Sequence, residues 1–390
     1  MNEKQTIFTP MFIRVCLVNF LLMFAQQLGN TLLPKYADYL GSSSVVVGMI
    51  TGIFSATALI IHAVSGQVID AFEKKKVVFY GSLTMTIAFI GYSLANDVTL
   101  LIISRLLHGC GVGLTVVACL TLASQAVSRE NITTGVAFYA ISGTIAQAIG
   151  PGIGLSLMNI LGYKKTFLIA TLIMVVATLL SLTLSGGKSN GGKIHFSIKD
   201  VYAVEAMVPT SIMVFLSGVN VNISSFLVLY ANSIGVEDIQ LYYTVNAIAL
   251  LVSKPLVGKL SDRYGTVKIL PWAIVCLGLA MYTIGCSTNI TMFLLAAVLN
   301  AFGYGACQPM IQALCVKSVS NDRRGAASST CYSGTDIGYL IGPVISGAIV
   351  EKYDYSTMFK VLPLFLLGAL LIFVINKKQL EDMDKGNNCS

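Results

Sequence analysis

Apolar residues in this chain are gathered into twelve runs of about 20 residues, with short polar connections between them. A helix of that length crosses the roughly 30 Å hydrocarbon core of a bilayer. The connections leave no aqueous segment large enough for a separate catalytic domain. The pattern therefore predicts an all-α membrane protein with twelve transmembrane helices, at 12–33, 45–69, 77–95, 98–124, 132–158, 165–184, 207–231, 238–260, 269–287, 290–316, 325–350 and 357–376.

Composition agrees with a membrane location. Of the 390 residues, 55% are hydrophobic and 11% charged, against about 25% charged in soluble proteins. The net charge of +7 does not indicate a nucleic-acid partner, because 18 of the 25 Lys and Arg fall in segments that would be cytoplasmic if both termini are inside. This positive-inside bias predicts a multi-pass protein of the cell (inner or plasma) membrane with both termini in the cytoplasm. The nine Cys show no CxxC or Cys/His ligand spacing, so we expect no metal, cofactor or disulfide.

The chain is an internal duplication. A Gly/Ser/Lys-rich stretch at 185–200, within a linker at 185–205, divides it almost equally, and an offset of 192 residues superposes landmarks such as Gly111 on Gly303 and Gly150-Pro151 on Gly342-Pro343. Six helices per copy place the two copies in the same orientation, related by an axis along the membrane normal. We therefore predict two pseudo-symmetric six-helix bundles, at 1–184 and 206–390, joined by a cytoplasmic linker, with a central cavity between them.

Two loops at equivalent places in the repeat carry the same polar motif. The second reads Gly258-Lys-Leu-Ser-Asp262-Arg263-Tyr-Gly265, and the first runs from Gly66 through Asp70 to Lys74. Both resemble the G-x-L-x-D-R-x-G-R-[KR] loop of the major facilitator superfamily, although Ala71 and Glu73 depart from it. The resemblance covers nearly the whole chain and implies the major facilitator fold. In the major facilitator fold, the resemblance implies that these residues form a conformational switch whose ion pairs break and re-form. The alternative is that both segments are solvated basic loops.

Two more stretches resemble signatures of the same family. Arg105-Leu-Leu-His108-Gly109 is similar to R-x-x-Q-G, with His for Gln, and the resemblance implies a role in proton transfer or in recognising substrate charge. A helix-locking Arg is the alternative. Copies of G-x-x-x-G-P-x-x-G lie in the fifth and eleventh helices, and in helix five this signature is associated with drug:proton antiporters. Generic small-residue packing is the alternative. The hinge and packing residues of the two copies are Gly150, Pro151, Gly154, Gly338, Gly342, Pro343 and Gly347.

Asp336 is the only carboxylate well inside an apolar run. It lies about 16 Å along its helix from the cytoplasmic end, where an isolated carboxyl can load and release protons near neutral pH. Asp336, with Arg105 and His108, is our candidate for proton coupling. A structural hydrogen-bonded Asp is the alternative.

Other polar side chains recur along the faces that line the cavity in this superfamily. Asn19 and Ser224 lie on such stripes, and each residue could equally form hydrogen bonds between helices without touching substrate. His62 and Lys254, at equivalent repeat positions, lie near the cytoplasmic ends, where basic side chains can snorkel. The candidates for the substrate cavity are Gln26, Asn30, Asn220, Asn300, Tyr304, Gln308, Tyr332 and Tyr339.

These observations predict a secondary active transporter that works by alternating access. We expect proton-coupled efflux of a drug-like amphiphile or a sugar, by a single chain whose partners are the substrate, protons and lipid. Uptake of a sugar or organic acid by proton symport is the alternative. An intramembrane enzyme is disfavoured because the sequence has no HExxH, GxSxG or pair of neighbouring membrane Asp, and a channel or sensor fits the duplicated loops poorly.

Overall fold

The computed structural model describes residues 8–127, 132–185, 202–320 and 323–385. In these ranges the chain is helical and contains no strand. The elements of the first part are α1 (Pro10–Asn30), α2 (Leu32–Tyr39), α3 (Ser44–Ala71), α4 (Lys74–Leu94), α5 (Val98–Gln125), α6 (Ile132–Leu161) and α7 (Tyr163–Ser181). Those of the second are η2 (Val204–Ala206), α9 (Met207–Ser233), α10 (Gln240–Tyr264), α11 (Thr266–Gly285), α12 (Ile290–Phe302), α13 (Tyr304–Lys317), α14 (Arg324–Lys352), α15 (Tyr355–Ile375) and α16 (Lys377–Asp384).

Twelve candidate membrane spans occur in the described residues, each close to a range predicted from the hydrophobic pattern. The prediction of a twelve-helix, multi-pass membrane protein is confirmed. Two of the predicted helices are not continuous, however. The first is followed after Asn30 by the short α2, and the tenth is interrupted at Gly303 between α12 and α13.

The residue at the interruption, Gly303, is sterically restricted to glycine. Gly303 adopts φ −81° and ψ −95°, and a Cβ there would lie 2.5 Å from the backbone nitrogen of Leu277 in α11. The backbones of the two elements meet at this point, so only glycine fits. Tyr304, the first residue of α13, is placed directly at the break.

The chain forms two compact units. Unit 1 consists of Met1–Tyr36 and Ala56–Phe196, and unit 2 of Ala37–Ser55 and Ser197–Ser390. Helix α3 is divided between them, because its first part, up to Ser55, belongs to unit 2. In that part the hydroxyl of Thr51 lies 3.0 Å from the hydroxyl of Ser225 in α9, and both side chains are buried.

Unit 1 is held together by glycines at its helix crossings. A Cβ at Gly111 in α5 would lie 2.7 Å from the carbonyl oxygen of Gly81 in α4, and a Cβ at Gly150 in α6 would lie 2.6 Å from Cβ of Gln27 in α1. Small residues are what allow helices to approach closely in lipid, where the hydrophobic effect does not drive helices together.

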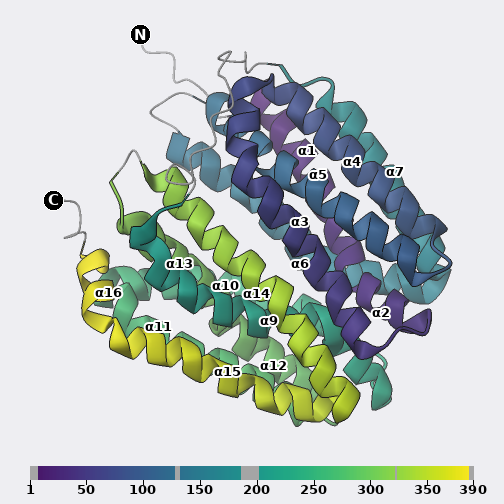
Figure 1. Cartoon of the computed structure of the whole chain (residues 1–390), viewed down its shortest axis with the longest axis vertical. Coiled ribbons are helices and arrows are strands. Elements are labelled where there is room, and N and C mark those ends of the chain that lie inside the picture. The colour runs from purple at the N-terminus through teal and green to yellow at the C-terminus, as the bar shows by residue number, and fades with distance from the viewer. Residues whose placement is uncertain (1–7, 128–131, 186–201, 321–322, 386–390) are drawn as a thin grey trace. The chain divides into compact units, whose positions relative to one another are not determined.

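Unit 2 has an equivalent crossing, between α9 and α14, which lie side by side (Figure 1). Gly334, Gly338 and Gly342, spaced by four residues, pack against α9, and a Cβ at Gly342 would collide with the backbone of Gly218. Gly347 packs in the same way against Ser44 of α3. The crossing therefore depends on one stripe of small residues along α14.

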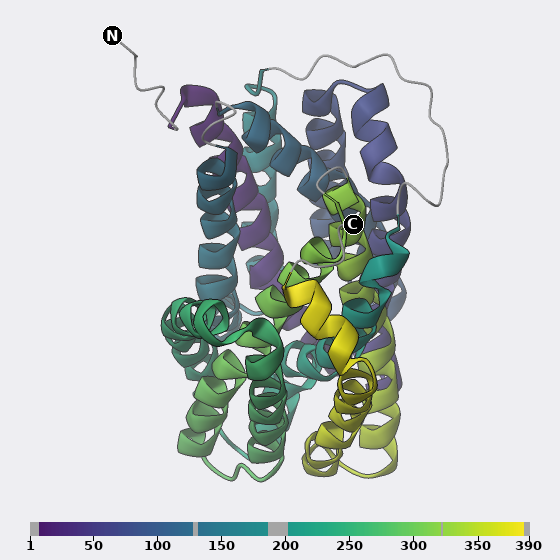
Figure 2. The same ribbon diagram turned by 90° about the vertical axis from the view of Figure 1, so that its left-hand side faces the viewer.

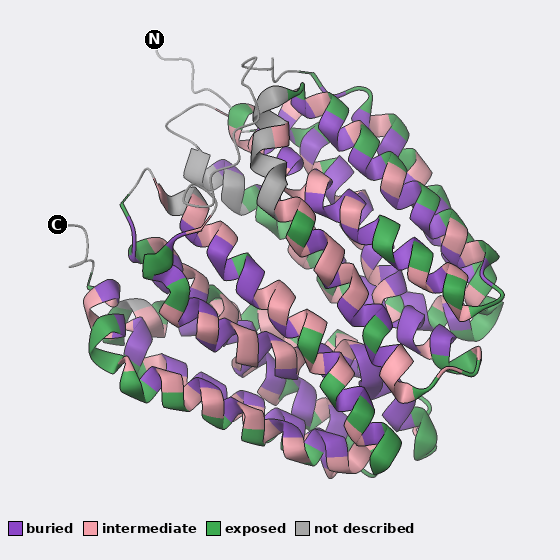
Figure 3. Ribbon diagram, in the orientation of Figure 1, coloured by how far each residue is buried: buried purple, intermediate pink, exposed green. Residues whose placement is uncertain are grey.

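Burial follows one side of each helix, as Figure 3 shows by the alternation of buried and exposed residues along the ribbons. The exposed side is apolar; Leu172 of α7 and Leu371 of α15, for example, are 58% and 61% exposed. A soluble protein would not leave such continuous apolar faces uncovered. In a membrane-spanning helix these faces contact the lipid acyl chains.

The short helix α16 follows directly after α15, at the end of the chain (yellow in Figure 2). It is amphipathic, and its apolar residues Leu380 and Met383 are fully buried. Asp384 accepts hydrogen bonds from the backbone nitrogens of Thr266 and Val267 in α11, at 2.6 and 3.4 Å. Lys317 of α13 adds an ion pair at 2.8 Å. The helix is thus docked on the ends of two membrane helices of unit 2.

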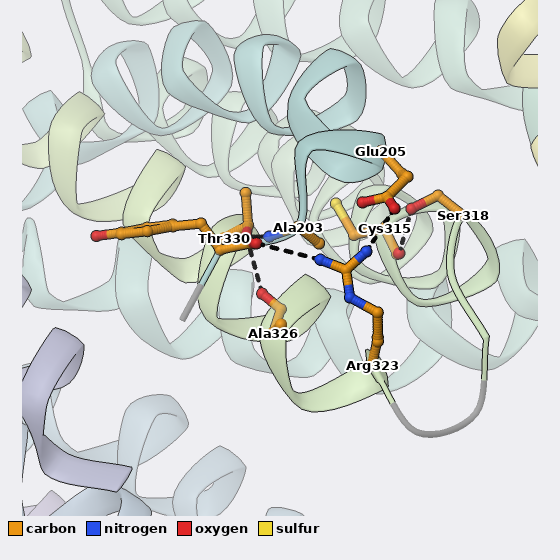
Figure 4. A network of polar contacts seen from close by, with 8 residues as sticks. Ala203, Glu205, Cys315, Ser318, Arg323, Ala326 and Thr330 are labelled. Carbon is orange, nitrogen blue, oxygen red and sulfur yellow. Dashed lines mark hydrogen bonds and ion pairs between the residues drawn. The ribbon is translucent and has the colours of Figure 1, made fainter. Parts of the chain in front are cut away.

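A second network at helix ends involves Arg323 (Figure 4). Its guanidinium pairs with Glu205 in η2 and donates to the carbonyl of Tyr202 at 3.4 Å. Nearby, the backbone nitrogen of Ala203 donates to Oγ1 of Thr330 at 2.9 Å. Together these contacts fix the start of α9 to the start of α14.

Candidate functional site

The polar cluster of unit 1 lies where α1, α4 and α5 meet. Arg105 and His108 of α5 are buried, with 3% and 0% exposure. Nη1 of Arg105 lies 3.4 Å from Oδ1 of Asn30 and 3.4 Å from Nδ1 of His108. The hydroxyl of Tyr92, from α4, is 3.2 Å from the same imidazole nitrogen. The predicted residues Arg105, His108 and Asn30 are therefore brought together, and Tyr92 is an addition that the sequence patterns did not indicate.

The geometry at His108 limits its protonation state. A guanidinium has only donors, so Nδ1 must act as the acceptor in its contact with Arg105. The imidazole in this arrangement is therefore neutral and carries its proton on Nε2. Arg105 donates to His108 in this arrangement.

Two other polar residues of α1 have different environments. Asn19 receives a hydrogen bond from Tyr139 and donates one to Ser142, both at 2.8 Å. Its amide therefore links α1 to α6, which agrees with the alternative that these polar residues form hydrogen bonds between helices. Gln26 is buried, and its Oε1 has no hydrogen-bond partner within the described residues, so Gln26 keeps a free acceptor.

The polar cluster of unit 2 is built on three elements, α9, α13 and α14. Tyr339 of α14 lies against the hydroxyl of Tyr304 and the amide of Asn220. Among the described residues, Oδ1 of Asn220 has no hydrogen-bond partner. Tyr304 occupies the break after Gly303, and its hydroxyl contacts Tyr339. A ligand with a donor group would satisfy the Asn220 oxygen.

Asp336 lies one helical turn before Tyr339 and is close to its phenol. Its side chain is half-buried. Tyr332, one turn further back, is half-exposed and lies beside Gln312 of α13, a residue that the sequence patterns did not indicate. Of the remaining candidates, Asn300 is buried with Oδ1 unpartnered in the described part of the chain, and Gln308 is half-buried. Tyr332 and Tyr339 thus share one face of α14 with Asp336.

The glycine signatures pack as small-residue motifs do. In α6, a Cβ at Gly154 would collide with the carbonyl of Leu28, and in α14 a Cβ at Gly338 would collide with Ser217 and Val214. Both prolines, Pro151 and Pro343, lie inside their helices without ending them. The partner glycines Gly218, Gly48 and Gly52 were not identified from the sequence, because a packing partner is a property of the fold.

The loop motifs are only partly described. Gly66 and Asp70 belong to α3 and Asp262 to α10, but the surroundings of these three residues lie outside what the structure describes. Lys74 is buried, at the first residue of α4, and the guanidinium carbon of Arg263 lies 5.2 Å from the ring centre of Tyr264. Gly265 has φ +91° and joins α10 to α11.

Gly258, in the second loop motif, is not at a close approach between helices. A Cβ there would meet no atom within 4 Å, so the structure shows no packing reason for glycine at this position. Near the same end of α10, Lys254 is half-buried.

In the described ranges, no group of three His, Cys, Asp or Glu side chains could hold a metal ion. Eight cysteines there are free thiols.

Within its described ranges the chain has twelve candidate membrane spans and buried polar clusters, which define a polytopic membrane protein. The model of the Major Facilitator Superfamily matches residues 15–197 and 210–386, and the chain belongs to this family. The resemblance seen in the loop and helix motifs is confirmed. Members of the family are transporters, which excludes the intramembrane enzyme considered above.

Two relatives extend over most of the chain. The multidrug resistance protein MdtG of Escherichia coli is 26% identical over 350 residues, which cover 84% of this chain and 85% of MdtG. An uncharacterised MFS-type transporter, MJ1560, of Methanocaldococcus jannaschii is 22% identical over 359 residues, or 89% of this chain and 92% of the relative.

Solved structures share the fold at low sequence identity. The nucleoside transporter NupG superposes with a TM-score of 0.75 and 16% identity, covering 94% of this chain and 99% of NupG. The peptide transporter POT in complex with sulfate superposes with a TM-score of 0.78 and 14% identity, covering 96% and 95%. The major facilitator fold is thereby confirmed.

Proposed function

We propose that the protein exports a drug-like amphiphile or a sugar in exchange for protons. The observation that carries the proposal is the half-buried Asp336 on the polar face of α14, next to Tyr339, which in turn contacts Tyr304 and Asn220. A carboxyl group in a membrane helix is costly to maintain and marks ion or substrate pathways. The 26% identity with MdtG, a multidrug resistance protein, supports export, as does the G-P signature of α6.

The mechanism follows from competition for one carboxyl group. Protonated Asp336 is neutral, and the ionised form can pair with a polar or cationic group of the substrate. Substrate binding then expels the proton, and reloading with a proton expels the substrate. Alternating access, in which the two units change their relative orientation, exposes the site to each side in turn.

Arg105 contributes a fixed positive charge in unit 1. Because His108 accepts from it and Asn30 bonds it as well, the guanidinium is pre-oriented for an anionic or hydroxyl group of the substrate. Gln26 offers an additional acceptor. We propose that these groups recognise substrate and that protons are carried in unit 2.

The topology belongs to the same proposal. The distribution of Lys and Arg supports cytoplasmic N- and C-termini in the cell membrane, and one chain supplies both units, so a monomer suffices for transport.

Flux in proteoliposomes tests the function. With an imposed pH gradient, an antiporter accumulates its substrate in the more acidic compartment and a symporter in the more alkaline one. A panel of fluorescent amphiphiles and labelled sugars is used, with protein-free vesicles as a control for passive distribution. Asp336→Asn should abolish gradient-driven flux, whereas the matched control Glu237→Gln, an exposed carboxylate in the α9–α10 connection, should retain it. Accumulation on the alkaline side, or full activity of Asp336→Asn, would overturn the proposal.

A further inference from the structure

A cavity of about 250 Å³ lies within unit 2 between α9, α14 and α15. Gly218, Gly338 and Gly342, from the crossing of α9 and α14, are among the residues that line it. The ring of Phe215 packs against α15 at Gly368, where a Cβ would lie 2.7 Å from it. The remaining lining is apolar and includes Val219, Leu362 and Phe365.

Ser346 is the one residue with a polar side chain among those that line this cavity. Its side chain is 1% exposed, and Oγ has no hydrogen-bond partner within the described residues. Other hydroxyls of α14 bond the carbonyl four residues earlier, for example Ser333 to Ser329 at 3.0 Å. A buried hydroxyl without a partner costs about 1–3 kcal/mol. Ser346 also stands where the G-P-x-x-G signature has its last glycine, so the hydroxyl is an addition to the pattern.

The cavity is separate from the proposed coupling site. At 100° per residue, Asp336 lies about 140° around α14 from the middle of Gly338 and Gly342, and Ser346 lies about 15 Å along the helix from Asp336, although Tyr339 is only about 60° from Gly342. Ile341 and Ile345 line the cavity but are 47% and 41% exposed. Exposed apolar side chains in the middle of a membrane span contact lipid, so the cavity opens toward the bilayer.

We propose that this cavity binds one acyl chain of a membrane phospholipid, and that Ser346 donates a hydrogen bond to the ester carbonyl of that chain. The volume is below the roughly 300–1,000 Å³ of pockets for drug-sized ligands, so it suits a chain segment. Ser346 lies about 9 Å along α14 from its end at Lys352. The interfacial layer is about 5–8 Å thick on each side, so Ser346 lies close to the depth of the esters. From there the cavity extends toward the membrane centre.

Photo-crosslinking in nanodiscs tests this proposal. The probe is a phosphatidylcholine with a diazirine in the middle of one acyl chain, present as a small fraction of the lipid. Adducts are mapped by peptide mass spectrometry on cavity residues (Phe215, Phe365) and on lipid-exposed positions of α15 outside the cavity (Leu364, Leu367). We expect adducts on the cavity residues to saturate at a low probe fraction, and those on the exposed leucines to rise in proportion to it.

Two variants make the test specific. Ser346→Ala keeps the space but removes the donor, and cavity labelling should fall about three- to tenfold, the worth of one hydrogen bond. Val214→Phe fills the cavity and should remove its labelling altogether. The control Ser333→Ala, whose hydroxyl already bonds Ser329, should label as the unmodified protein does. Because Ser346→Ala is nearly isosteric, it remains informative if Val214→Phe does not fold.

Three results would overturn the proposal. Equal, non-saturating labelling of cavity and exposed residues would mean that only the general lipid layer is seen. Unchanged labelling in Ser346→Ala would remove the role of the hydroxyl. If a transported amphiphile removed cavity labelling but unlabelled phospholipid did not, the cavity would be assigned to substrate instead.

Discussion

Oδ2 of Asp384, near the end of the chain, lies 2.6 Å from the backbone nitrogen of Thr266, the first residue of α11. The carboxylate satisfies a helix N-terminal N–H that would otherwise lack a partner. The same group pairs with Lys317. The tail helix α16 is therefore anchored at the loop where the second copy of the G-x-L-x-D-R motif ends.

Replacing this anchor should release α16. For Asp384→Asn we expect a local loss of about 1 kcal/mol, typical for a helix cap, and faster hydrogen exchange in residues 377–384. The control is Asp382→Asn on the same helix, which should exchange as the unmodified protein does. Equal exchange in both variants would mean that the apolar contacts of Leu380 and Met383 hold α16 without the cap.

The anchor should also be sensitive to acid. Burial raises the pKa of Asp384, but hydrogen bonds from Lys317 and Thr266 outweigh it and hold the pKa below its usual value. A carboxyl with a depressed pKa stabilises the folded state above its unfolded pKa of about 4 and loses this contribution as the pH falls through its folded pKa. Docking of α16 should therefore be constant at neutral pH and weaken only below about pH 4, as hydrogen exchange at several pH values would show.

Two variants in the polar cluster of unit 1 distinguish charge recognition from proton transfer. His108→Gln keeps an acceptor for Arg105 but cannot titrate, and we expect it to retain most of the transport. Arg105→Ala removes the fixed charge and should lower transport at least tenfold. If His108→Gln is as inactive as Arg105→Ala in the flux assay, the imidazole carries protons and our assignment of roles is wrong.

Crossing glycines should differ sharply in their tolerance to alanine. Gly342→Ala places a methyl group against the backbone of Gly218, which cannot rotate away, and should cost about 1–3 kcal/mol. Gly258→Ala meets no atom and should be neutral or stabilising by up to about 1 kcal/mol, because alanine favours the helix. Thermal unfolding in detergent compares the two. A similar decrease of Tm in both variants would contradict the close packing of α9 and α14.

We expect the first part of α3 to leave α9 during transport, because α3 is one continuous helix divided between the two units and follows unit 1 when the units reorient. The buried pair Thr51 and Ser225 reports on this step. With the native cysteines replaced, Thr51→Cys with Ser225→Cys should form a disulfide under oxidation, stop transport and recover it on reduction. Thr51→Cys alone should be insensitive to oxidant. Normal transport by the cross-linked protein would exclude the movement.

The apolar runs in the sequence predicted the membrane spans, because a bilayer requires about 20 apolar residues in each helix. They did not predict the break at Gly303, since the run is apolar on both sides of it and the backbone of Leu277, which restricts this position to glycine, belongs to another helix. Asp384 looked like an ordinary residue of a polar tail, because its partner Thr266 is 118 residues away.

For the candidate site, the sequence predicted which residues share a helix face but not which other helix they contact. Asp336, Tyr332 and Tyr339 share a face by helical periodicity alone, and the structure places them on one face. Asn19 lies on a similar stripe, yet its amide bonds Tyr139 and Ser142 of α6. Periodicity tells which residues share a face; it does not tell which neighbouring helix covers that face.

The central claim, that proton and substrate compete for Asp336, is tested most directly by measuring proton release on substrate binding. Purified protein in weakly buffered detergent solution, with a pH-sensitive dye, is titrated with a transported compound near neutral pH. The account predicts release of about one proton per substrate bound, and none from Asp336→Asn although it still binds. Substrate binding that releases no proton from the unmodified protein, or takes one up, would contradict it.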